Sequence, residues 1–584
     1  MTNKTLQDIF RERSDDRFAS CPYILYKVVR DEPYRMLTYG EFTRRSIAFA
    51  AALHALGIQR GDRILIASES RPEWMITDFA SIILGAISVP VFPTLTSHQT
   101  QYIVEHSQAK LAVVSSEYQL RKILAVIDQL PLLESVIVMD DTVQLPTHER
   151  VRFEHFSKLE TEFAGTTASY ADVTPDDVVT IIYTSGTTGV PKGVMLTHRN
   201  LVSNVAASRA AIPAVDKDDI FLSFLPLSHG FERVASYLKF SVGLQVAYAE
   251  SIDSVARNLV EIKPTVMTAV PRFFERVYSR IDATRASLTP TRRYIFDWGM
   301  RVGAKYAKPL EGERVGILTR ALYPIADTLV LKKVRERTGG KIRFIFSGGA
   351  ALKPELGRAF AALGITILEG YGLTETSPVV AVNREGSVRW GTVGHPIDGV
   401  EVRIADDGEI LVRGENVMKG YYRDEHATRQ MIDADGWLHT GDIGVCDEQG
   451  RIRITDRKKH LIILANGKNI APAPIESMIE SSPLIDQVVV LGELRDFCSA
   501  LIVPNHEAIA DPATARHQIE QELARINREL AGYEKIRRFE LLAEPFTLEN
   551  GMLTPTLKVR RKEVERRYAD LIEGMYADRR SHAE

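Results

Sequence analysis

The residues best suited to chemistry lie in one loop of glycine and hydroxyl side chains. An apolar run from Val178 to Tyr183, rich in β-branched residues, predicts a buried strand. It leads directly into Thr184–Gly189, which reads TSGTTG, and Lys192 follows. Glycine lets the backbone approach a ligand closely, and converging amide, hydroxyl and ammonium donors suit phosphate oxygens. This composition favours a phosphate-binding loop over a flexible surface loop. It is not a Walker A loop, because no G-x-x-x-x-G-K-[ST] string occurs in the sequence.

A second segment carries groups that could hold a base, a phosphate and a metal ion. Gly370 and Gly372 flank Tyr371, whose ring offers a flat face for a base. Thr374 and Glu375 follow, and a hydroxyl beside a carboxylate suits phosphate and magnesium binding. Read alone, the segment is also compatible with a strand–turn–helix junction that carries a surface glutamate.

Four further features each allow a structural and a functional interpretation. The predicted strand 342–346 ends in the small residues Ser347–Ala351, which permit close approach of a ligand. His229 follows another strand-like run, where an isolated histidine is more often structural. Asp442 follows a glycine, which usually indicates turn chemistry. The polar tetrad Asp456–Lys459 lies between two predicted strands and indicates a linker.

The elements that would position these residues alternate between helices and strands. Thr38 and Glu41 have the spacing of a capping box, so a helix is expected to begin there and to end at Gly57. Strands that alternate with helices favour parallel α/β layers. The expected strands are 64–67, 86–91, 111–114, 136–139, 178–183, 342–346, 488–491 and 500–503, and further helices are expected over 6–13, 72–84, 281–331 and 513–530.

Length and composition limit the class of protein. The 584 residues exceed one ordinary core, so two or more domains are expected. A net charge of −3 gives no electrostatic reason to expect nucleic-acid binding. Cys21, Cys446 and Cys498 are scattered, which predicts no disulfide framework and no zinc site. The N-terminus is charged throughout, and no apolar run is long enough to span a bilayer, so we expect a soluble cytoplasmic protein. Peripheral membrane contact stays open.

The motifs together resemble a known superfamily. Tyr183–Gly193, YTSGTTGVPKG, resembles the signature phosphate loop of the adenylate-forming superfamily, which comprises acyl-CoA synthetases, luciferases and the adenylation domains of peptide synthetases. The strings His229–Arg233 and Val270–Tyr278 are similar to the long-chain fatty acyl branch, as is Thr554–Lys558, TPTLK. This last string departs from the common P-x-x-x-x-G-K form, because no glycine precedes the lysine, and Lys562 is a competing candidate.

The resemblance implies a fold and an activity. The fold would be α/β, with a large multi-subdomain N-terminal domain over 1–455, a small mobile α+β C-terminal domain over 456–584, and a hinge at Asp456. The activity would be ATP-dependent conversion of a long-chain fatty acid to an acyl-adenylate, with release of pyrophosphate. Transfer of the acyl group to CoA would then give acyl-CoA and AMP. The cofactors and partners implied are ATP, Mg²⁺, CoA and a fatty acid, and no nucleic acid.

The resemblance also assigns roles to individual residues. Lys558 would bridge the substrate carboxylate and the α-phosphate, His229 would lie near that carboxylate, and Gly467 would face the site during the thiol step. Glu375 and Thr184 would hold Mg²⁺, and both count among the catalytic residues. The implied ATP or AMP contacts are Thr184, Ser185, Gly186, Thr187, Thr188, Gly189, Lys192, Gly348, Gly349, Ala350, Glu369, Gly370, Tyr371, Gly372, Thr374, Asp442 and Arg457.

Two other functions fit parts of the same pattern. One is a fatty acyl-AMP ligase that passes the acyl group to a carrier protein. The other is a non-catalytic nucleotide- or lipid-binding relative, which loss of Glu375, Asp442 or Lys558 would favour; all three are present. The sequence leaves open the acyl chain length, the choice between CoA and a carrier protein, and the choice between a monomer and a homodimer.

Overall fold

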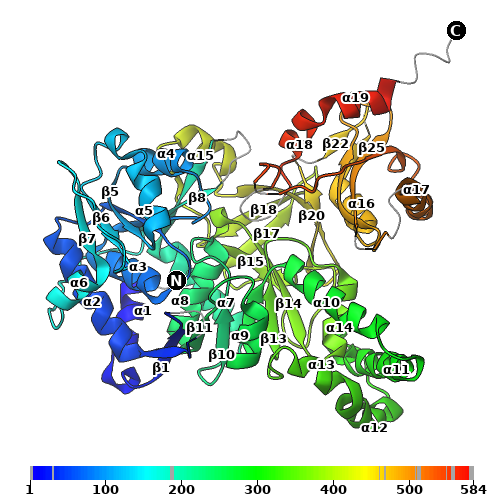
Figure 1. Ribbon diagram of the computed structural model, residues 1–584, viewed down its shortest axis with the longest axis horizontal. Coiled ribbons are helices and arrows are strands. Elements are labelled where there is room, and N and C mark those ends of the chain that lie inside the picture. The colour runs from blue at the N-terminus through cyan, green and yellow to red at the C-terminus, as the bar shows by residue number, and fades with distance from the viewer. Residues whose placement is uncertain are drawn as a thin grey trace. The chain divides into compact units, whose positions relative to one another are not determined.

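The chain folds into two compact units (Figure 1). The computed structural model describes residues 4–28, 32–184, 190–458, 461–465, 468–506, 508–509, 514–547, 549–553 and 559–577. The first unit comprises Met1–Arg403, Leu411–Thr440 and Cys446–Arg453. The second comprises Ile404–Ile410, Gly441–Val445 and Ile454–Glu584. The predicted boundary at 455/456 and the hinge at Asp456 stay predictions.

The first unit contains an eight-stranded sheet that carries the glycine-rich loop. Strands β3 to β7 pair in parallel, and β8 and β9 form an antiparallel hairpin beside β4. The near-continuous apolar runs of these strands suit a sheet that is covered on both faces. In sheet order the strands are β19 (Gly420–Tyr421), β9 (Lys192–Thr197), β8 (Val178–Thr184), β4 (Ile87–Val91), β3 (Arg63–Ala67), β5 (Ala109–Val114), β6 (Ser135–Val138) and β7 (Arg152–His155).

A nine-stranded sheet forms the other layer of the first unit. Its centre is parallel, and antiparallel strands close both edges. In sheet order the strands are β16 (His395–Pro396), β15 (Val379–Val382), β14 (Thr366–Gly372), β13 (Phe344–Ser347), β12 (Val266–Ala269), β10 (Ile220–Ser223), β11 (Gln245–Tyr248), β1 (Pro22–Tyr26) and β2 (Arg35–Thr38).

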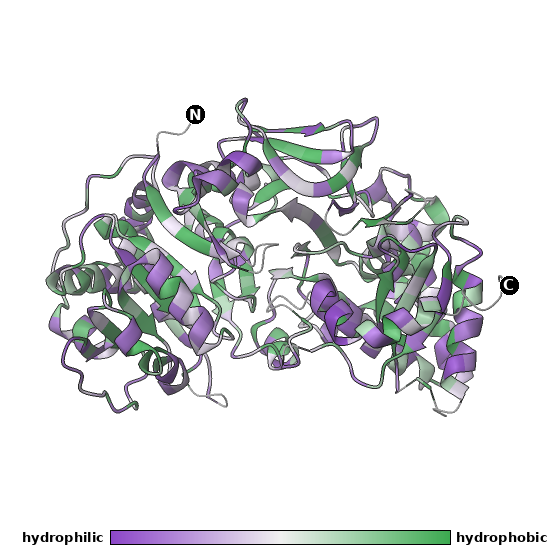
Figure 2. Ribbon diagram, turned by 90° about the horizontal axis from the view of Figure 1, so that it is seen from above, coloured by the Kyte–Doolittle hydropathy of each residue, from purple (hydrophilic) through white to green (hydrophobic). Residues whose placement is uncertain are grey.

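Helices cover both sheets of the first unit, and the strands inside the layers are mainly apolar (Figure 2). The capping box predicted from Thr38 and Glu41 is present at the start of α2. The helices are α1 (Leu6–Arg13), α2 (Tyr39–Ala55), α3 (Pro72–Leu84), α4 (Ser97–Ser107), α5 (Glu117–Leu124), α6 (Phe156–Glu162), α7 (His198–Ala211), α8 (Gly230–Val242), α9 (Val255–Ile262), α10 (Pro271–Ala286), α11 (Pro290–Tyr306), α12 (Ile317–Ala326), α13 (Lys332–Glu336), α14 (Pro354–Ala362) and α15 (Glu425–Met431).

Helix α8 is hydrogen-bonded to the eight-stranded sheet through a buried arginine. The guanidinium of Arg233 donates to Thr180 on β8 and to Ser88 on β4, each at 2.6 Å, and pairs with the carboxylate of Asp78 on α3. The Tyr237 hydroxyl also donates to Asp78, at 2.5 Å. Arg233 and Asp78 are fully buried, so the charges need these partners to be tolerated.

The same helix is bonded to the nine-stranded sheet through the residue that precedes Arg233. The Glu232 carboxylate accepts from Ser223 on β10 and from Thr268 on β12, and it pairs with Lys239 two turns further along α8. Helix α8 is therefore bonded to both sheets. From the sequence, the string His229–Arg233 indicated only a similarity to the long-chain fatty acyl branch. In the structure, the charges of Glu232 and Arg233 are buried and hold α8 to the two sheets.

The second unit is a smaller α+β structure. Strands β24 (Ile485–Leu491), β25 (Cys498–Pro504) and β26 (Ile536–Leu541) form a three-stranded sheet, with β24 antiparallel and β26 parallel to β25. The division between the units falls within the four-stranded sheet β17 (Val400–Ile404), β18 (Glu409–Gly414), β20 (Leu438–Cys446) and β21 (Ile452–Arg457). The remaining elements are β22 (Ile462–Ile463), β23 (Asn469–Ile470), α16 (Pro472–Ile479), α17 (Ala515–Ile526), α18 (Arg561–Arg567) and α19 (Ala569–Ala577).

The predicted α/β class, with a large and a small unit, is confirmed. Among the described residues, no helix combines the length and apolar character needed to cross a bilayer.

Candidate active site

The glycine-rich loop joins the two strands of a hairpin at the end of the eight-stranded sheet. Thr184, the last residue of β8, lies opposite Lys192, the first residue of β9. The predicted strand before the loop is confirmed as β8, and a second strand, β9, follows the loop. Ser185, Gly186, Thr187, Thr188 and Gly189 lie outside the described residues, so their predicted phosphate contacts stay predictions.

Tyr421, which is not among the predicted site residues, connects Lys192 with Glu375. The Lys192 ammonium nitrogen lies 5.2 Å from the centroid of the Tyr421 ring, a cation–π distance. The Tyr421 hydroxyl donates a hydrogen bond of 2.9 Å to Oε1 of Glu375. Burial, and then the nearby Glu375 carboxylate, raise the pKa of Tyr421 well above its ordinary value, so the hydroxyl stays a donor at physiological pH. The predicted phosphate lysine and the predicted magnesium ligand are thus brought together.

Tyr421 reaches this position because its short strand extends the hairpin. Strand β19 pairs antiparallel with β9, placing Tyr421 opposite Val194 and Gly420 opposite Met195. A Cβ on Gly420 would lie 2.8 Å from a Thr428 side-chain carbon, and the φ of this glycine is +140°. Glycine therefore permits the close approach that seats the strand. The sequence signal that could have identified the residue is the Gly-Tyr-Tyr string after 419.

The backbone of the Glu375 turn is held by amide groups from other elements. The Met418 amide donates to the carbonyl oxygen of Glu375 at 2.9 Å. The Asn416 side chain donates to the Thr376 carbonyl oxygen at 3.1 Å, and Asn204 on α7 donates to that of Val379 at 2.7 Å. These two asparagines were also not selected from the sequence. They position the turn, and their contacts are with backbone carbonyl groups.

His229 is the N-cap of α8, and its ring has a defined orientation. Its Nδ1 accepts a 3.2 Å hydrogen bond from the Phe231 amide. In the neutral imidazole this places the proton on Nε2, which becomes the donor. A Cβ on Gly230 would lie 3.9 Å from the hydroxyl oxygen of Thr374. The start of α8 therefore lies close to the Thr374–Glu375 turn, and two separately predicted motifs meet.

The predicted adenine segment is closely packed and contains a protonatable glutamate. A Cβ on Gly372 would lie 1.7 Å from a carbonyl oxygen, so only glycine fits there. Tyr371 is 8% exposed, and its predicted stacking on adenine stays a prediction. Glu369 is 4% exposed, and burial raises its pKa to about 7. Gly348 is buried against the Phe231 ring, whereas Gly349 and Ala350 are exposed; Gly370 is half-buried.

In the second unit, two of the predicted nucleotide contacts, Asp442 and Arg457, form an ion pair. The Arg457 Nε donates to Oδ1 of Asp442 at 2.8 Å, and Asp442 is 3% exposed. Lys458 pairs with Asp407 at 2.6 Å and with Glu409 at 2.9 Å. The structure therefore brings Asp442 and Arg457 together, while the contact of either with a nucleotide stays a prediction.

Asp456, the predicted hinge residue, is buried at the start of α16. Its Oδ1 accepts from the Arg457 amide at 2.6 Å, and the amide of Ala473 lies near the carboxylate. Burial raises its pKa to about 6, although these amides act in the opposite direction. The Asp456 carboxylate therefore lies beside the N-terminal end of α16, the first helix of the small unit.

The predicted catalytic lysine and the thiol-step glycine, Lys558 and Gly467, lie outside the described residues. The segment that contains Lys558 is bracketed by an isolated bridge between Leu553 and Val559. The competing candidate, Lys562, is exposed on α18. The assignment of Lys558 therefore stays a prediction.

The donor set near Glu375 fits a magnesium ion that shares its ligands with substrate phosphates. Mg²⁺ usually takes one or two carboxylates from the protein and its other ligands from phosphates and water. Among the described residues, no group of three or more His, Cys, Asp and Glu side chains could hold a metal ion by itself. Glu375 offers one carboxylate, oriented by the Tyr421 hydroxyl, and Thr184 offers a hydroxyl at the start of the loop. This set leaves the other magnesium positions to phosphates and water.

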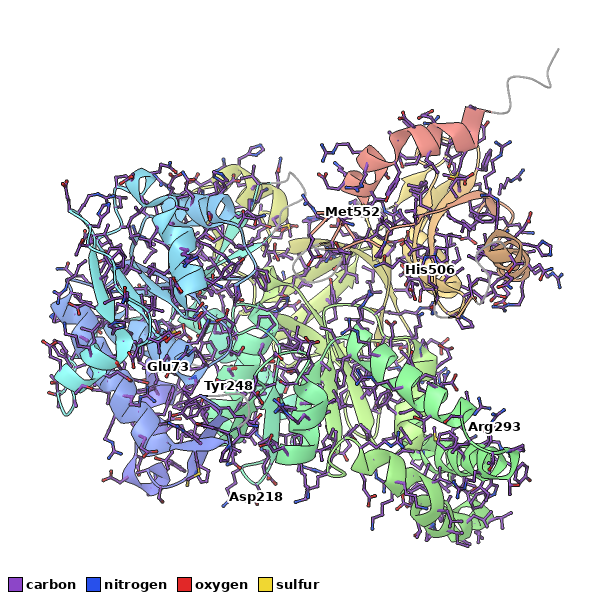
Figure 3. The ribbon with its side chains drawn as sticks, in the orientation of Figure 1. Glu73, Asp218, Tyr248, Arg293, His506 and Met552 are labelled. Carbon is purple, nitrogen blue, oxygen red and sulfur yellow. The ribbon has the colours of Figure 1, made fainter. Side chains whose placement is uncertain are left out.

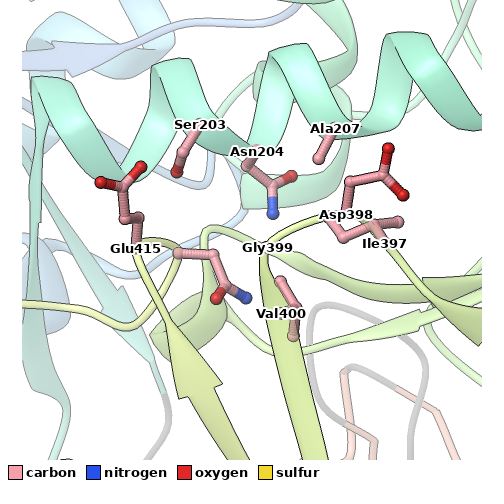
Figure 4. Close-up of a pocket in the computed structure, with 9 residues that line it drawn as sticks. Ser203, Asn204, Ala207, Ile397, Asp398, Gly399, Val400 and Glu415 are labelled. Carbon is pink, nitrogen blue, oxygen red and sulfur yellow. The ribbon is translucent and has the colours of Figure 1, made fainter. Parts of the chain in front are cut away.

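A separate pocket of about 260 Å³ lies beside α7, and Asn204 and Asn416 are among the residues that line it (Figure 4). It includes none of the predicted site residues. Its lining residues are Ser203, Asn204, Ala207, Ile397, Asp398, Gly399, Val400, Glu415 and Asn416.

The hairpin that carries the glycine-rich loop, the Tyr421–Glu375 contact and the His229 N-cap lie on two α/β layers, an arrangement that fits an adenylate-forming type of enzyme. Comparison with known families agrees. The AMP-binding enzyme profile matches residues 13–422, and the AMP-binding enzyme C-terminal domain profile matches 459–580. The chain belongs to the AMP-binding enzyme family.

Curated relatives resemble the chain over nearly its whole length. A long-chain-fatty-acid–CoA ligase, FadD15 of Mycobacterium tuberculosis, is 36% identical over 97% of this chain and 96% of its own. A peroxisomal long chain acyl-CoA synthetase of Arabidopsis thaliana is 33% identical over 98% of this chain and 86% of its own. The adenylation domain of a carboxylate reductase from Mycobacterium chelonae has the same fold, with a TM-score of 0.80, 24% identity, and coverage of 99% of this chain and 92% of that domain.

Proposed function

We propose that this protein is an AMP-forming ligase that joins a long-chain fatty acid to CoA through an acyl-adenylate. The observation that carries the chemistry is the link from Lys192 through Tyr421 to Glu375. This link places the Lys192 cation, which would bind phosphate oxygens, and the Glu375 carboxylate, which would bind a metal ion, on either side of Tyr421 at the end of the phosphate loop. The substrate class is supported by the names of relatives that match 97–98% of the chain.

The first half-reaction needs positioning more than a protein nucleophile. A carboxylate oxygen of the fatty acid attacks the α-phosphorus of ATP, the bond to the bridging oxygen breaks, and pyrophosphate leaves. Lys192 and the loop bind the departing phosphates, and His229 donates from Nε2 to the fatty acid carboxylate. Mg²⁺, held by Glu375 and Thr184, would neutralise phosphate charge. Fixed charges and donors of this kind are the main source of catalysis at phosphorus.

The second half-reaction replaces AMP with a thiol. The sulfur of CoA attacks the carbonyl carbon of the acyl-adenylate, and AMP leaves with the electrons of the broken carbon–oxygen bond. In our proposal Asp442 and Arg457 hold the ribose, Tyr371 stacks on adenine, and Gly467 lies along the path of the thiol. Rotation of the small domain at Asp456 separates the two half-reactions.

Lys558→Ala tests this division of labour. The variant should lose acyl-adenylate formation and still convert supplied acyl-adenylate to the thioester, because the lysine is needed only while negative charge gathers at the α-phosphorus. Pyrophosphate release measures the first half-reaction, and acyl-CoA formed from synthetic acyl-adenylate measures the second. Lys562→Ala is the matched control, and it should keep both activities. Loss of both half-reactions in Lys558→Ala, or loss of the first in Lys562→Ala, would contradict the assignment.

The acceptor, the location and the assembly complete the proposal. CoA rather than a carrier protein is the acceptor, and acyl-CoA formation with free CoA tests this choice. The three cysteines are free thiols, which suits the reducing cytoplasm. We propose a cytoplasmic protein with peripheral membrane contact, present as a monomer or a homodimer. Equilibrium sedimentation distinguishes these two states.

A further inference from the structure

The helical segment 271–340, which contains α10 to α13, carries a charge opposite in sign to that of the rest of the chain. It holds 15 Lys and Arg residues and 7 Asp and Glu residues, a net charge of +8. The whole chain has 73 and 76 of these residues, so the remainder carries 58 and 69, a net charge of −11. In Figure 3, Arg293 marks the outer end of α11, at the periphery of the first unit. A local excess of this size favours an anionic partner.

Helix α12 and the π-helical turn Asp327–Leu331 that continues it present a stripe of apolar side chains to solvent. Ile317 is 88% exposed, Leu318 73%, Ile325 52% and Leu329 48%. Residues 318, 325 and 329 are spaced by seven and four, so they lie on one face of the helix. We call these four residues the α12 stripe. Two neighbouring side chains as large and as exposed as Ile317 and Leu318 indicate a surface that becomes covered in use.

The side of this helical segment opposite the stripe is buried against the rest of the first unit, so the stripe faces solvent. Ala326 and Leu331 are completely buried, and Val330 is 5% exposed. The Tyr323 ring stacks on Tyr306 of α11, with centroids 3.7 Å apart and planes 15° apart. The helix is therefore seated on α11 by one face while the other stays in water.

Cations flank the stripe at both ends. Arg314 and Arg320 lie at its start, Lys332 and Lys333 at its end, and all four side chains are exposed. None of them forms an ion pair within the part of the chain that the structure describes. An apolar face bordered by exposed Lys and Arg is typical of helices that lie in the interface of an anionic bilayer, where the cations reach the headgroups.

We propose that the α12 stripe and its four flanking cations bind the surface of an anionic lipid bilayer, with α12 lying in the plane of the interface. A second copy of the chain fits less well, because a two-fold contact would place two segments of +8 against each other. This proposal does not depend on the proposed reaction, since it concerns lipid binding in the absence of ATP, CoA and fatty acid.

Flotation of the full chain with vesicles tests the proposal. Vesicles of phosphatidylcholine alone should bind weakly, and vesicles that also contain phosphatidylglycerol should bind well and release the protein as salt is added. The double variant Ile317→Ser/Leu318→Ser should lower the partition coefficient at least tenfold, roughly the effect of withdrawing a few methylene groups from the bilayer. Lys332→Glu/Lys333→Glu should lower it by at least about 25-fold, since each basic residue contributes about fivefold.

Control variants at other exposed sites distinguish binding by the α12 stripe from a general effect of surface hydrophobicity or net charge. Ile252→Ser/Leu494→Ser removes two apolar side chains that are 60% and 73% exposed, and should bind vesicles like the parent. Lys217→Glu/Arg528→Glu makes the same charge change at exposed sites outside the segment and should have a much smaller effect. All variants alter exposed side chains, so their unfolding midpoints should match the parent.

Several results would overturn the proposal. The parent could fail to bind phosphatidylglycerol vesicles, or the stripe variant could bind them as well as the parent. A stripe variant that turns a homodimer into a monomer, with vesicle binding unchanged, would assign the surface to a second copy of the chain.

Discussion

Removal of one hydroxyl at Tyr421 should weaken the first half-reaction while leaving the fold intact. Tyr421→Phe keeps the ring 5.2 Å from the Lys192 ammonium nitrogen and deletes the 2.9 Å hydrogen bond to Glu375. A hydrogen bond to a charged group contributes about 1.5–3 kcal/mol, which corresponds to a loss of about 10- to 150-fold if the bond orients Glu375 in the transition state. Because Glu375 would hold Mg²⁺, the concentration of Mg²⁺ needed for half-maximal rate should also rise.

The assay is pyrophosphate release from ATP and a fatty acid, measured as kcat/KM across a series of Mg²⁺ concentrations. Tyr422→Phe is the matched control, because it makes the same chemical change in the residue that follows β19, where the neighbouring ring is His106. A simple structural role for Tyr421 would lower the unfolding midpoint without altering the Mg²⁺ dependence. Unchanged kcat/KM in Tyr421→Phe, or an equal loss in Tyr422→Phe, would refute the role assigned to this hydroxyl.

Three further predictions concern the structure around the site. Arg233→Met should destabilise the fold by about 3–5 kcal/mol by leaving the Asp78 carboxylate buried without its cation, and Asp78→Asn/Arg233→Met should cost less than the sum of the single changes; urea unfolding checks both. Glu369 has a pKa of about 7 in the fold against 4.5 in the unfolded chain, so the folded state binds the extra proton and stability falls as pH rises between these values. Glu369→Gln should therefore gain about 3 kcal/mol relative to the parent from about pH 4.5 to above 7, seen as diverging urea midpoints; parallel midpoints would contradict the raised pKa. Gly372→Ala should lose about 3 kcal/mol in thermal unfolding because its Cβ would overlap a carbonyl oxygen at 1.7 Å, whereas Gly316→Ala, whose Cβ would meet nothing within 4 Å, should be neutral.

The sequence predicted the elements around the phosphate loop well, because local patterns specify them. The β-branched run before Thr184 and the capping box at Thr38 depend on neighbouring residues and are present in the structure. The α/β class followed from the alternation of such elements. The pairing of Thr184 with Lys192 could be expected only in outline, since strand register depends on how the chain turns between them.

The contacts that complete the site could not be read from local patterns. Tyr421 lies 46 residues from Glu375 in sequence, and only the pairing of β19 with β9 brings the two together. The string that contains Glu232 and Arg233 was recognised as a family marker, but its charges are buried and hold α8 between the sheets. A charged residue in a sequence is ordinarily assigned to the surface, and burial depends on partners from distant elements.

The most direct test of the account follows an oxygen atom from the fatty acid. If the carboxylate attacks the α-phosphorus of ATP, hexadecanoate carrying isotopically labelled carboxylate oxygen, incubated with the protein, ATP, Mg²⁺ and CoA, should transfer one labelled oxygen to AMP as acyl-CoA forms. Mass spectrometry of the nucleotide and phosphate products measures this transfer. Label in AMP, with unlabelled pyrophosphate, is the predicted result. Label in inorganic phosphate with ADP as the product, or acyl-CoA formed without label in AMP, would contradict it.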